Sequence, residues 1–95
     1  MSLTIVYQKQ FKKDFKLMVK RGLVQSKLAE IIELLMNQKD IPIKYRDHNL
    51  VDSKSYYDAR ELHIQPDCLL IYKIDIIQQR LILIRTGSHS DLFMK

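Results

Sequence analysis

The chain has 95 residues, of which 46% are hydrophobic and 28% charged. This globular mixture excludes extended disorder and supports one domain with a modest core, which we expect to occupy residues 1–95. Lysine and arginine total 16 against 11 acidic residues, a net charge of +5 that favours a polyanionic partner such as RNA, DNA or an acidic protein. A single cysteine excludes an internal disulfide. With no signal-like start and no apolar run long enough for a bilayer, the sequence predicts a cytoplasmic protein without membrane association.

The first elements predicted along the chain are a strand and two helices. Leu3–Tyr7 is short, β-branched and apolar, which is typical of a strand. Gln8–Lys20 carries apolar residues at helical spacing on one face and lysines on the opposite face. Val24–Asn37 repeats the helical spacing, and the short connection around Gly22 predicts an antiparallel helical hairpin.

The second half of the chain predicts a loop followed by strands. Residues 40–54 have no lasting period and are rich in turn formers, so we expect them to cross from the helices to a sheet. Strands are expected at Tyr56–Ile64, Cys68–Asp75 and Arg80–Thr86, with turns at Gln65–Asp67 and Gln78–Gln79. Helices grouped before strands predict an α+β domain, in which two N-terminal helices pack on an antiparallel sheet of about four strands.

One polar cluster is expected near the end of the strand at 56–64. Residues two apart on a strand share a face, so Glu61 and His63 project together, and Asp67 can fold back beside His63 after the turn. A carboxylate next to an imidazole suits proton transfer, because it raises the histidine pKa toward working pH. Taken alone, a solvated strand end with ordinary turn residues explains this octapeptide better.

A second group of polar residues follows the last predicted strand. Arg85 presents a fixed fork of donors that can clamp a phosphate, His89 can protonate a leaving oxygen, and Phe93 can stack on a base. His48, beside Asp47 in the crossing loop, is the third histidine. Each of these residues individually has a more ordinary explanation as part of the surface or the core.

Other features set limits on the chemistry. The three histidines lack the spacing of a zinc site, and no glycine-rich phosphate loop is present, so no metal and no cofactor is expected. Cys68 opens an apolar strand and is expected to be partly buried. The lysines of the first helix form either a solvated face or a surface for phosphates and RNA; they are Lys9, Lys12, Lys13, Lys16 and Lys20.

Together these segments resemble the YafQ-like toxins of the RelE superfamily. The resemblance covers nearly the whole chain and rests on four stretches that occur in the family's order and spacing. They are Tyr45–Leu50, Arg60–Asp67, Leu70–Tyr72 and Arg85–Phe93. Any one stretch is weak evidence, whereas four in register are specific.

The resemblance implies a RelE-like fold and the toxin component of a type II toxin–antitoxin system. Such toxins are endoribonucleases that cut messenger RNA in the ribosomal A site, and an antitoxin protein neutralises them. Carried over by position, the implied site residues are His48, Glu61, His63, Asp67, Arg85, His89 and Phe93.

The implied reaction needs no metal ion: a base activates the ribose 2′-OH, which attacks the adjacent phosphate, and an acid protonates the departing 5′ oxygen. His89 is expected to be the acid and Arg85 to stabilise the charge on the phosphate. His48 is expected to contact phosphate or assist proton transfer. The general base can be Asp67, Glu61 or His63, and the sequence does not choose among them.

One departure from the family concerns Cys68, because YafQ itself carries a tryptophan at this position. RNA binding is therefore expected to lean on Phe93 and Tyr72, with Lys9, Lys12, Lys13 and Lys16 as further RNA contacts. The expected partners are messenger RNA, the ribosome and an antitoxin whose acidic or amphipathic segment covers the basic surface.

Two alternatives stay open. One is a gyrase-directed toxin of the ParE type, which does not need this set of histidines and carboxylates. The other is a non-catalytic module that binds nucleic acid or protein, and the lysine-rich helix is the only feature in its favour.

Overall fold

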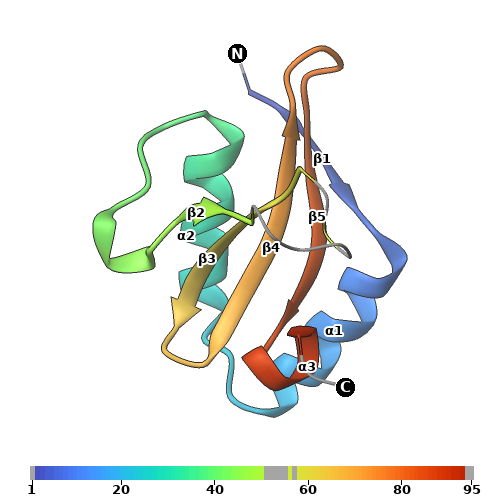
Figure 1. Cartoon of the computed structure of the whole chain (residues 1–95), viewed down its shortest axis with the longest axis vertical. Coiled ribbons are helices and arrows are strands. Elements are labelled where there is room, and N and C mark those ends of the chain that lie inside the picture. Colours follow the sequence, from blue (N-terminus) through green and yellow to red (C-terminus); the bar gives the residue numbers. More distant parts are fainter. Residues whose placement is uncertain (1, 51–55, 57, 94–95) are drawn as a thin grey trace.

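A five-stranded sheet in the order β1-β5-β4-β3-β2 organises the described part of the chain (Figure 1). The computed structural model describes residues 2–50, 56 and 58–93. The strands are β1 (Thr4–Tyr7), β2 (His48–Asn49), β3 (Arg60–Gln65), β4 (Cys68–Asp75) and β5 (Arg80–Gly87). The helices are α1 (Lys9–Lys20), α2 (Gln25–Met36) and α3 (His89–Phe93), with one 3-10 turn, η1 (Ile43–Tyr45).

The predicted α+β class is confirmed, and the sheet differs from the prediction in two details. It is mixed, because β1 pairs with β5 in parallel, from Thr4 opposite Arg80 to Tyr7 opposite Leu83. It also gains β2, a short strand inside the predicted loop that pairs antiparallel with β3. A parallel pair needs a long crossover, which everything between β1 and β5 supplies.

The element boundaries follow the predictions closely except around residue 56. The strand expected at Tyr56–Ile64 begins only at Arg60. Position 57 of that strand and positions 51–54 of the predicted loop lie outside the described residues.

The main core lies between the sheet and the helices α1 and α2, which share one side of it in Figure 1. Alternate residues of the three central strands enter this core, and the helices supply the facing layer from their apolar faces. Burying each large side chain contributes roughly 1.5–3 kcal/mol. The strand residues are Leu62, Ile64, Leu70, Tyr72, Leu81 and Leu83, and the helix residues include Phe11, Met18, Leu28, Ile31 and Leu35.

A smaller core lies on the opposite face of the sheet, under α3. Its buried members are Ala59, Leu69, Ile71 and Leu92. The β3–β4 register places Glu61 opposite Ile71 and His63 opposite Leu69. Glu61 and His63 therefore face α3 and not the helical hairpin, since directly paired residues point to the same side of a sheet.

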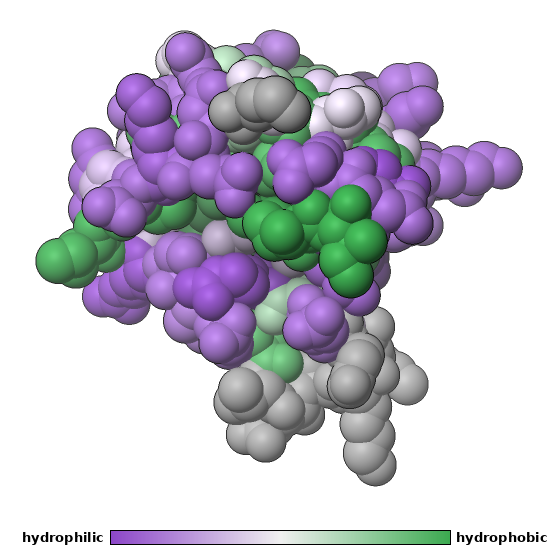
Figure 2. All heavy atoms as spheres, turned by 90° about the horizontal axis from the view of Figure 1, so that it is seen from above, coloured by the Kyte–Doolittle hydropathy of each residue, from purple (hydrophilic) through white to green (hydrophobic). Residues whose placement is uncertain are grey.

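The surface at the end of the sheet where β4 turns into β5 is mainly hydrophilic, with a few apolar patches (Figure 2). Ile76 and Ile77 in this turn are exposed by 55% and 94%. Within the described ranges, every helix is too short or too polar to cross a bilayer.

A partly buried polar anchor ties the segment that carries β2 to the sheet. The hydroxyl of Tyr72 on β4 donates a hydrogen bond to Asp47 Oδ1. Arg60 on β3 donates from Nη2 to Asp47 Oδ2 at 2.8 Å and from Nη1 to Asn49 Oδ1 at 2.7 Å. Burial and then the bond to Asp47 raise the pKa of Tyr72. The position of His48, next to Asp47, depends on this anchor.

Tyr72→Phe removes the hydroxyl from the anchor while keeping the ring in the core. Because Asp47 then loses a donor inside a partly buried network, we expect the free energy of unfolding to fall by about 1–3 kcal/mol, measured by urea denaturation. The matched control is Tyr7→Phe, at a tyrosine that is 47% exposed, where a change within about 0.5 kcal/mol is expected. Equal losses in the two variants would contradict the anchor.

Candidate active site

Three elements bring the three histidines to one face of the sheet. His48 on β2 pairs directly with Glu61 on β3, and His63 lies two residues further along β3. After β5 the chain turns back into α3, whose first residue is His89. The ring centroids of His89 and His63 are 5.9 Å apart. Residues separated by up to 41 positions in the chain thus form one cluster, as the sequence predicted for His63 and Glu61.

Glu61 lies between two of the histidines and is almost fully buried, with 3% of its surface exposed. Its Oε1 is 3.5 Å from Nε2 of His48 and 3.8 Å from Nε2 of His63. A buried carboxylate is costly unless charge or hydrogen bonds compensate it, and these two rings are its ion-pair partners. The carboxylate in turn attracts the positive charge that either ring gains on protonation.

The orientation of His48 is set from its other nitrogen. Nδ1 lies 2.7 Å from the carbonyl oxygen of Arg46. A carbonyl only accepts, so Nδ1 carries a hydrogen in this geometry, and Nε2 is the atom directed at Glu61. Only a His48 ring that is protonated on both nitrogens can donate to the Arg46 carbonyl oxygen and to Glu61 Oε1 at the same time.

An aromatic surface continues the cluster from His89 toward the C-terminal end of the described chain. The ring centroids of His89 and Phe93 are 6.0 Å apart, one turn of α3. Phe93 in turn meets Tyr56 edge to face at 5.7 Å. Phe93 is 41% exposed, so its ring can offer a face to a ligand.

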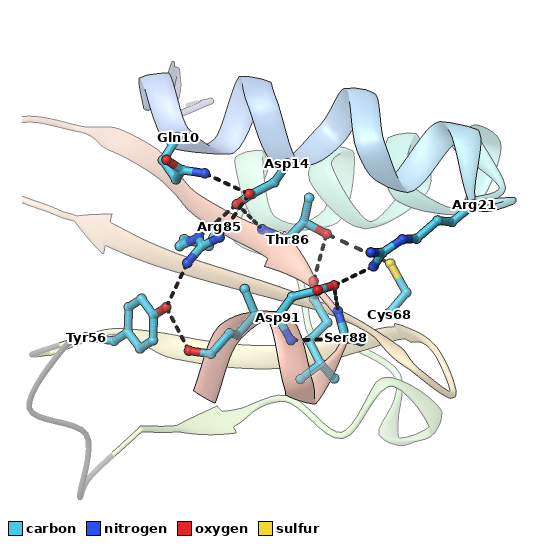
Figure 3. A network of polar contacts seen from close by, with 11 residues as sticks. Gln10, Asp14, Arg21, Tyr56, Cys68, Arg85, Thr86, Ser88 and Asp91 are labelled. Carbon is cyan, nitrogen blue, oxygen red and sulfur yellow. Dashed lines mark hydrogen bonds and ion pairs between the residues drawn. The ribbon is translucent and has the colours of Figure 1, made fainter. Parts of the chain in front are cut away.

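Arg85 is held at the edge of this surface by a carboxylate from α1 (Figure 3). Its Nε donates to Asp14 Oδ2 at 2.9 Å and its Nη2 donates to Asp14 Oδ1 at 3.0 Å. Nη1 donates to the Tyr56 hydroxyl at 3.4 Å. The hydrogen bonds to Asp14 raise the pKa of Arg85 and outweigh the effect of burial. The guanidinium is therefore a fixed cation whose Nη1 edge faces Tyr56.

Asp14 is the residue that sequence reasoning missed. It is 7% exposed, and it also accepts from Gln10 Nε2 at 3.0 Å and from the backbone N–H of Thr86 at 3.3 Å. A signal was present in the sequence, because Asp14 interrupts the apolar face of α1 three residues after Phe11 and four before Met18. An acid at that spacing indicates a buried basic partner, but 71 residues separate it from Arg85.

Contacts around residue 88 fix the short helix that carries His89 and Phe93. Asp91 Oδ2 accepts from the backbone N–H of Ser88 at 3.0 Å, and Ser88 Oγ accepts from the backbone N–H of Asp91 at 3.1 Å. The bond from Ser88 is the largest of the effects that lower the pKa of Asp91. Arg21 Nη1 adds an ion pair to Asp91 at 2.7 Å. Gly87 allows this close approach, since a Cβ there would lie 3.0 Å from Asp91 Cβ.

Two predicted residues lie apart from the cluster. Asp67 is exposed in the β3–β4 turn and lines a different hollow with Arg21 and Ser88. No contact with His63 is described for it. Tyr72, expected to help bind RNA, is 1% exposed on the core side of the sheet. That expectation is wrong, because the buried ring offers no face to a base.

Cys68 and the lysines of α1 also lie away from the histidines. Cys68 is 4% exposed in the main core, and burial raises the pKa of its thiol, so it is no nucleophile. Lys12 and Lys16 line a groove between α1 and α2, on the side of α1 opposite Asp14. Lys9 and Lys13 are exposed on the same helix. Among the described residues, no group of three or more His, Cys, Asp or Glu could hold a metal ion.

The Asp14–Arg85 pair is expected to be strongly coupled. Asp14→Asn and Arg85→Met each leave one charge unpaired at a mostly buried position, so each should lower the free energy of unfolding by about 3 kcal/mol. The double variant should lose less than the sum, with a coupling of about 1–3 kcal/mol in a double-mutant cycle from urea denaturation.

The matched control cycle uses Lys73→Met and Asp58→Asn, a surface pair at 4.0 Å. Its coupling should stay below about 1 kcal/mol. A coupling for Asp14 and Arg85 that is no larger than this would show that the pair does not hold Arg85 in place.

Comparisons with known proteins connect this arrangement to a described family. Residues 3–94 match the family described as "Bacterial toxin of type II toxin-antitoxin system, YafQ". The "mRNA interferase toxin YafQ" of Escherichia coli strain B / BL21-DE3 is 43% identical over 91 residues, which are 94% of this chain and 94% of that protein.

Solved structures agree with the sequence comparison. A metal-bound toxin from Helicobacter pylori superposes with a TM-score of 0.87 at 41% identity, covering 96% of this chain and 99% of that one. YafQ in the Escherichia coli DinJ–YafQ complex superposes with a TM-score of 0.83 at 39% identity, covering 96% of this chain and 98% of that one.

Proposed function

The chain belongs to the YafQ family of bacterial toxins from type II toxin–antitoxin systems, and from this premise we propose that its histidine cluster is the centre at which it cleaves RNA. Like the Escherichia coli relatives, it is an mRNA interferase, an endoribonuclease. The observation that supports the proposed site is that five side chains lie next to one another on the sheet face opposite α1 and α2. These are His48, Glu61, His63, His89 and Phe93.

The proposed reaction is an attack of the ribose 2′-OH on the adjacent phosphate. The base removes the 2′-OH proton, the 2′-O–P bond forms, and the P–O5′ bond breaks as the acid protonates the departing 5′ oxygen. The products are a 2′,3′-cyclic phosphate and a free 5′-OH. Such a reaction needs two proton-transfer groups on different sides of one phosphate. The rings of His63 and His89, 5.9 Å apart, support that arrangement.

We assign His63 as the base and His89 as the acid. Glu61 is too buried to reach a ribose, and Asp67 has no described contact with the cluster. Glu61 instead stabilises the imidazolium that forms when His63 takes the proton, as a carboxylate beside a histidine does in other acid–base sites. His48 shares the same carboxylate oxygen and is positioned to assist proton transfer or to meet a phosphate oxygen.

Arg85 and Phe93 supply binding and charge stabilisation in this proposal. Arg85 is fixed by Asp14, so its Nη1 edge can meet a phosphate oxygen without reorganisation, which is the condition for effective charge stabilisation. Phe93 stacks on a base next to the cleaved bond, supported from the side by Tyr56.

The wider setting extends the same proposal. Messenger RNA is cut in the ribosomal A site, in the cytoplasm, and the exposed lysines of α1 contact ribosomal phosphates. An antitoxin neutralises the chain, as implied by the DinJ–YafQ toxin–antitoxin complex of Escherichia coli. The net charge of +5 supports both kinds of partner.

His63→Ala and His89→Ala test whether both histidines take part in proton transfer. Each should lower the cleavage rate by about 10²–10⁴-fold, the contribution of one general acid or base. The measurement is primer extension on a defined messenger RNA with purified ribosomes.

The control for this experiment is Lys39→Ala, at an exposed lysine three residues after the end of α2, which should cleave at the native rate. The proposal fails if both histidine variants cleave like the control.

A further inference from the structure

A second concave surface adjoins the histidine cluster. It is a pocket of about 370 Å³, bounded by α2, η1 and the end of β3. His63 lines this pocket as well as the cluster, so the two surfaces are continuous. The other lining residues that matter here are Lys27, Lys44, Arg46 and Gln65. We call this surface the basic pocket.

The basic pocket concentrates positive charge that the described protein does not neutralise. Lys27 comes from α2, Lys44 from η1, and Arg46 from the residue that ends η1. Among the ion pairs of the described residues, none involves these three side chains. Of the described residues that line the pocket, none is acidic. Like charges that converge on one hollow repel one another, and an anion bound there removes the repulsion.

The backbone at Arg46 links the pocket to the proposed catalytic cluster. Arg46 has a left-handed backbone with φ of 51°, a conformation that is unfavourable for a non-glycine residue. Its carbonyl oxygen is the partner of His48 Nδ1 at 2.7 Å. The same strained residue therefore orients a histidine with its backbone and lines the pocket with its side chain.

Gln65 adds an oriented neutral donor. Its Oε1 accepts from the backbone N–H of Val24 at 2.8 Å. With the oxygen occupied, the Nε2 amide of this lining residue has no hydrogen-bond acceptor among the described residues and remains available as a donor. A donor beside several cations suits an oxyanion better than a cation or an apolar group.

The order of these surfaces defines a direction across the protein. Phe93, His89 and His63 follow one another at ring-centroid distances of 6.0 Å and 5.9 Å, and the basic pocket begins at His63. Consider an RNA strand whose scissile phosphate lies between the two histidines. The nucleotides on one side of that phosphate then lie at the aromatic surface, and those on the other side lie at the basic pocket.

We propose that the basic pocket binds a backbone phosphate of the RNA strand on the flank opposite Phe93, next to the phosphate that is cleaved. This inference rests on the proposed function of the histidine cluster. It assigns Lys27, Lys44 and Arg46 to substrate binding, with no part in proton transfer. Phosphate contacts position a strand without reading its bases, so the pocket sets register on the strand and leaves base preference to other residues.

The test uses Lys27→Ala/Lys44→Ala, which removes two exposed cations and leaves the strained residue Arg46 intact. The charge-matched control is Lys39→Ala/Lys73→Ala, two lysines outside the pocket. The probe is a single-stranded RNA oligonucleotide that contains the cleaved sequence, with a 2′-deoxy sugar at the cleavage position to prevent attack. Its Kd is measured by fluorescence anisotropy at several salt concentrations.

For the pocket variant, we plot the logarithm of the association constant against the logarithm of the salt concentration. The slope should become shallower by about 0.7 for each lost phosphate contact. The Kd should rise by about tenfold or more per contact. The control should keep the native slope. Identical slopes for the pocket variant and the control would overturn the proposal.

A second binding experiment distinguishes phosphates of the substrate RNA from phosphates of ribosomal RNA. The same proteins are bound to ribosomes with an empty A site. A loss that occurs with ribosomes but not with the oligonucleotide assigns the pocket to ribosomal RNA and overturns a substrate subsite. Failure of the proposed function looks different, because the native chain would then not cut messenger RNA although the salt slopes could still differ.

Discussion

The alternation of side chains along β3 is the constraint on which the site depends. Leu62 and Ile64 point into the main core, while Glu61 and His63 point to the face that α3 covers. A shift of one residue in the β3–β4 register would exchange these two sets and expose the core residues. The hydrophobic demand of the main core therefore also fixes where the carboxylate and the imidazole point.

The division of strand residues between the two faces of the sheet also explains how much the sequence could predict. Period-two spacing was sufficient to place Glu61 beside His63, and the apolar run Cys68–Asp75 was predicted with its observed limits. Tyr72 was misplaced because alternation within one strand does not say which face meets the helices. Tyr72 lies two residues from Leu70 on the same strand and shares its face, so both side chains enter the main core. The parallel pairing of β1 was missed because it depends on a crossover, for which no local pattern exists.

Long-range polar contacts were the least accessible feature. His48 and His89 entered the site only through resemblance to a family, because their neighbours in the chain do not point to His63. Asp14 was not found at all, although it determines how Arg85 is held. A carboxylate on the core-facing side of α1 is unfavourable for packing, and the bidentate pair compensates for it. Stability and the placement of a phosphate-binding cation are therefore joined in one contact between the helical layer and the last strand.

The tight contact at Gly87 has a consequence for how such a toxin can be lost. A methyl group there would lie 3.0 Å from Asp91 Cβ and 3.3 Å from Leu92 Cδ2, so these neighbours would have to shift by a few tenths of an ångström. Both neighbours belong to α3, the helix that carries His89 and Phe93. A substitution at Gly87 can therefore disturb the proposed site without replacing a histidine or a cation.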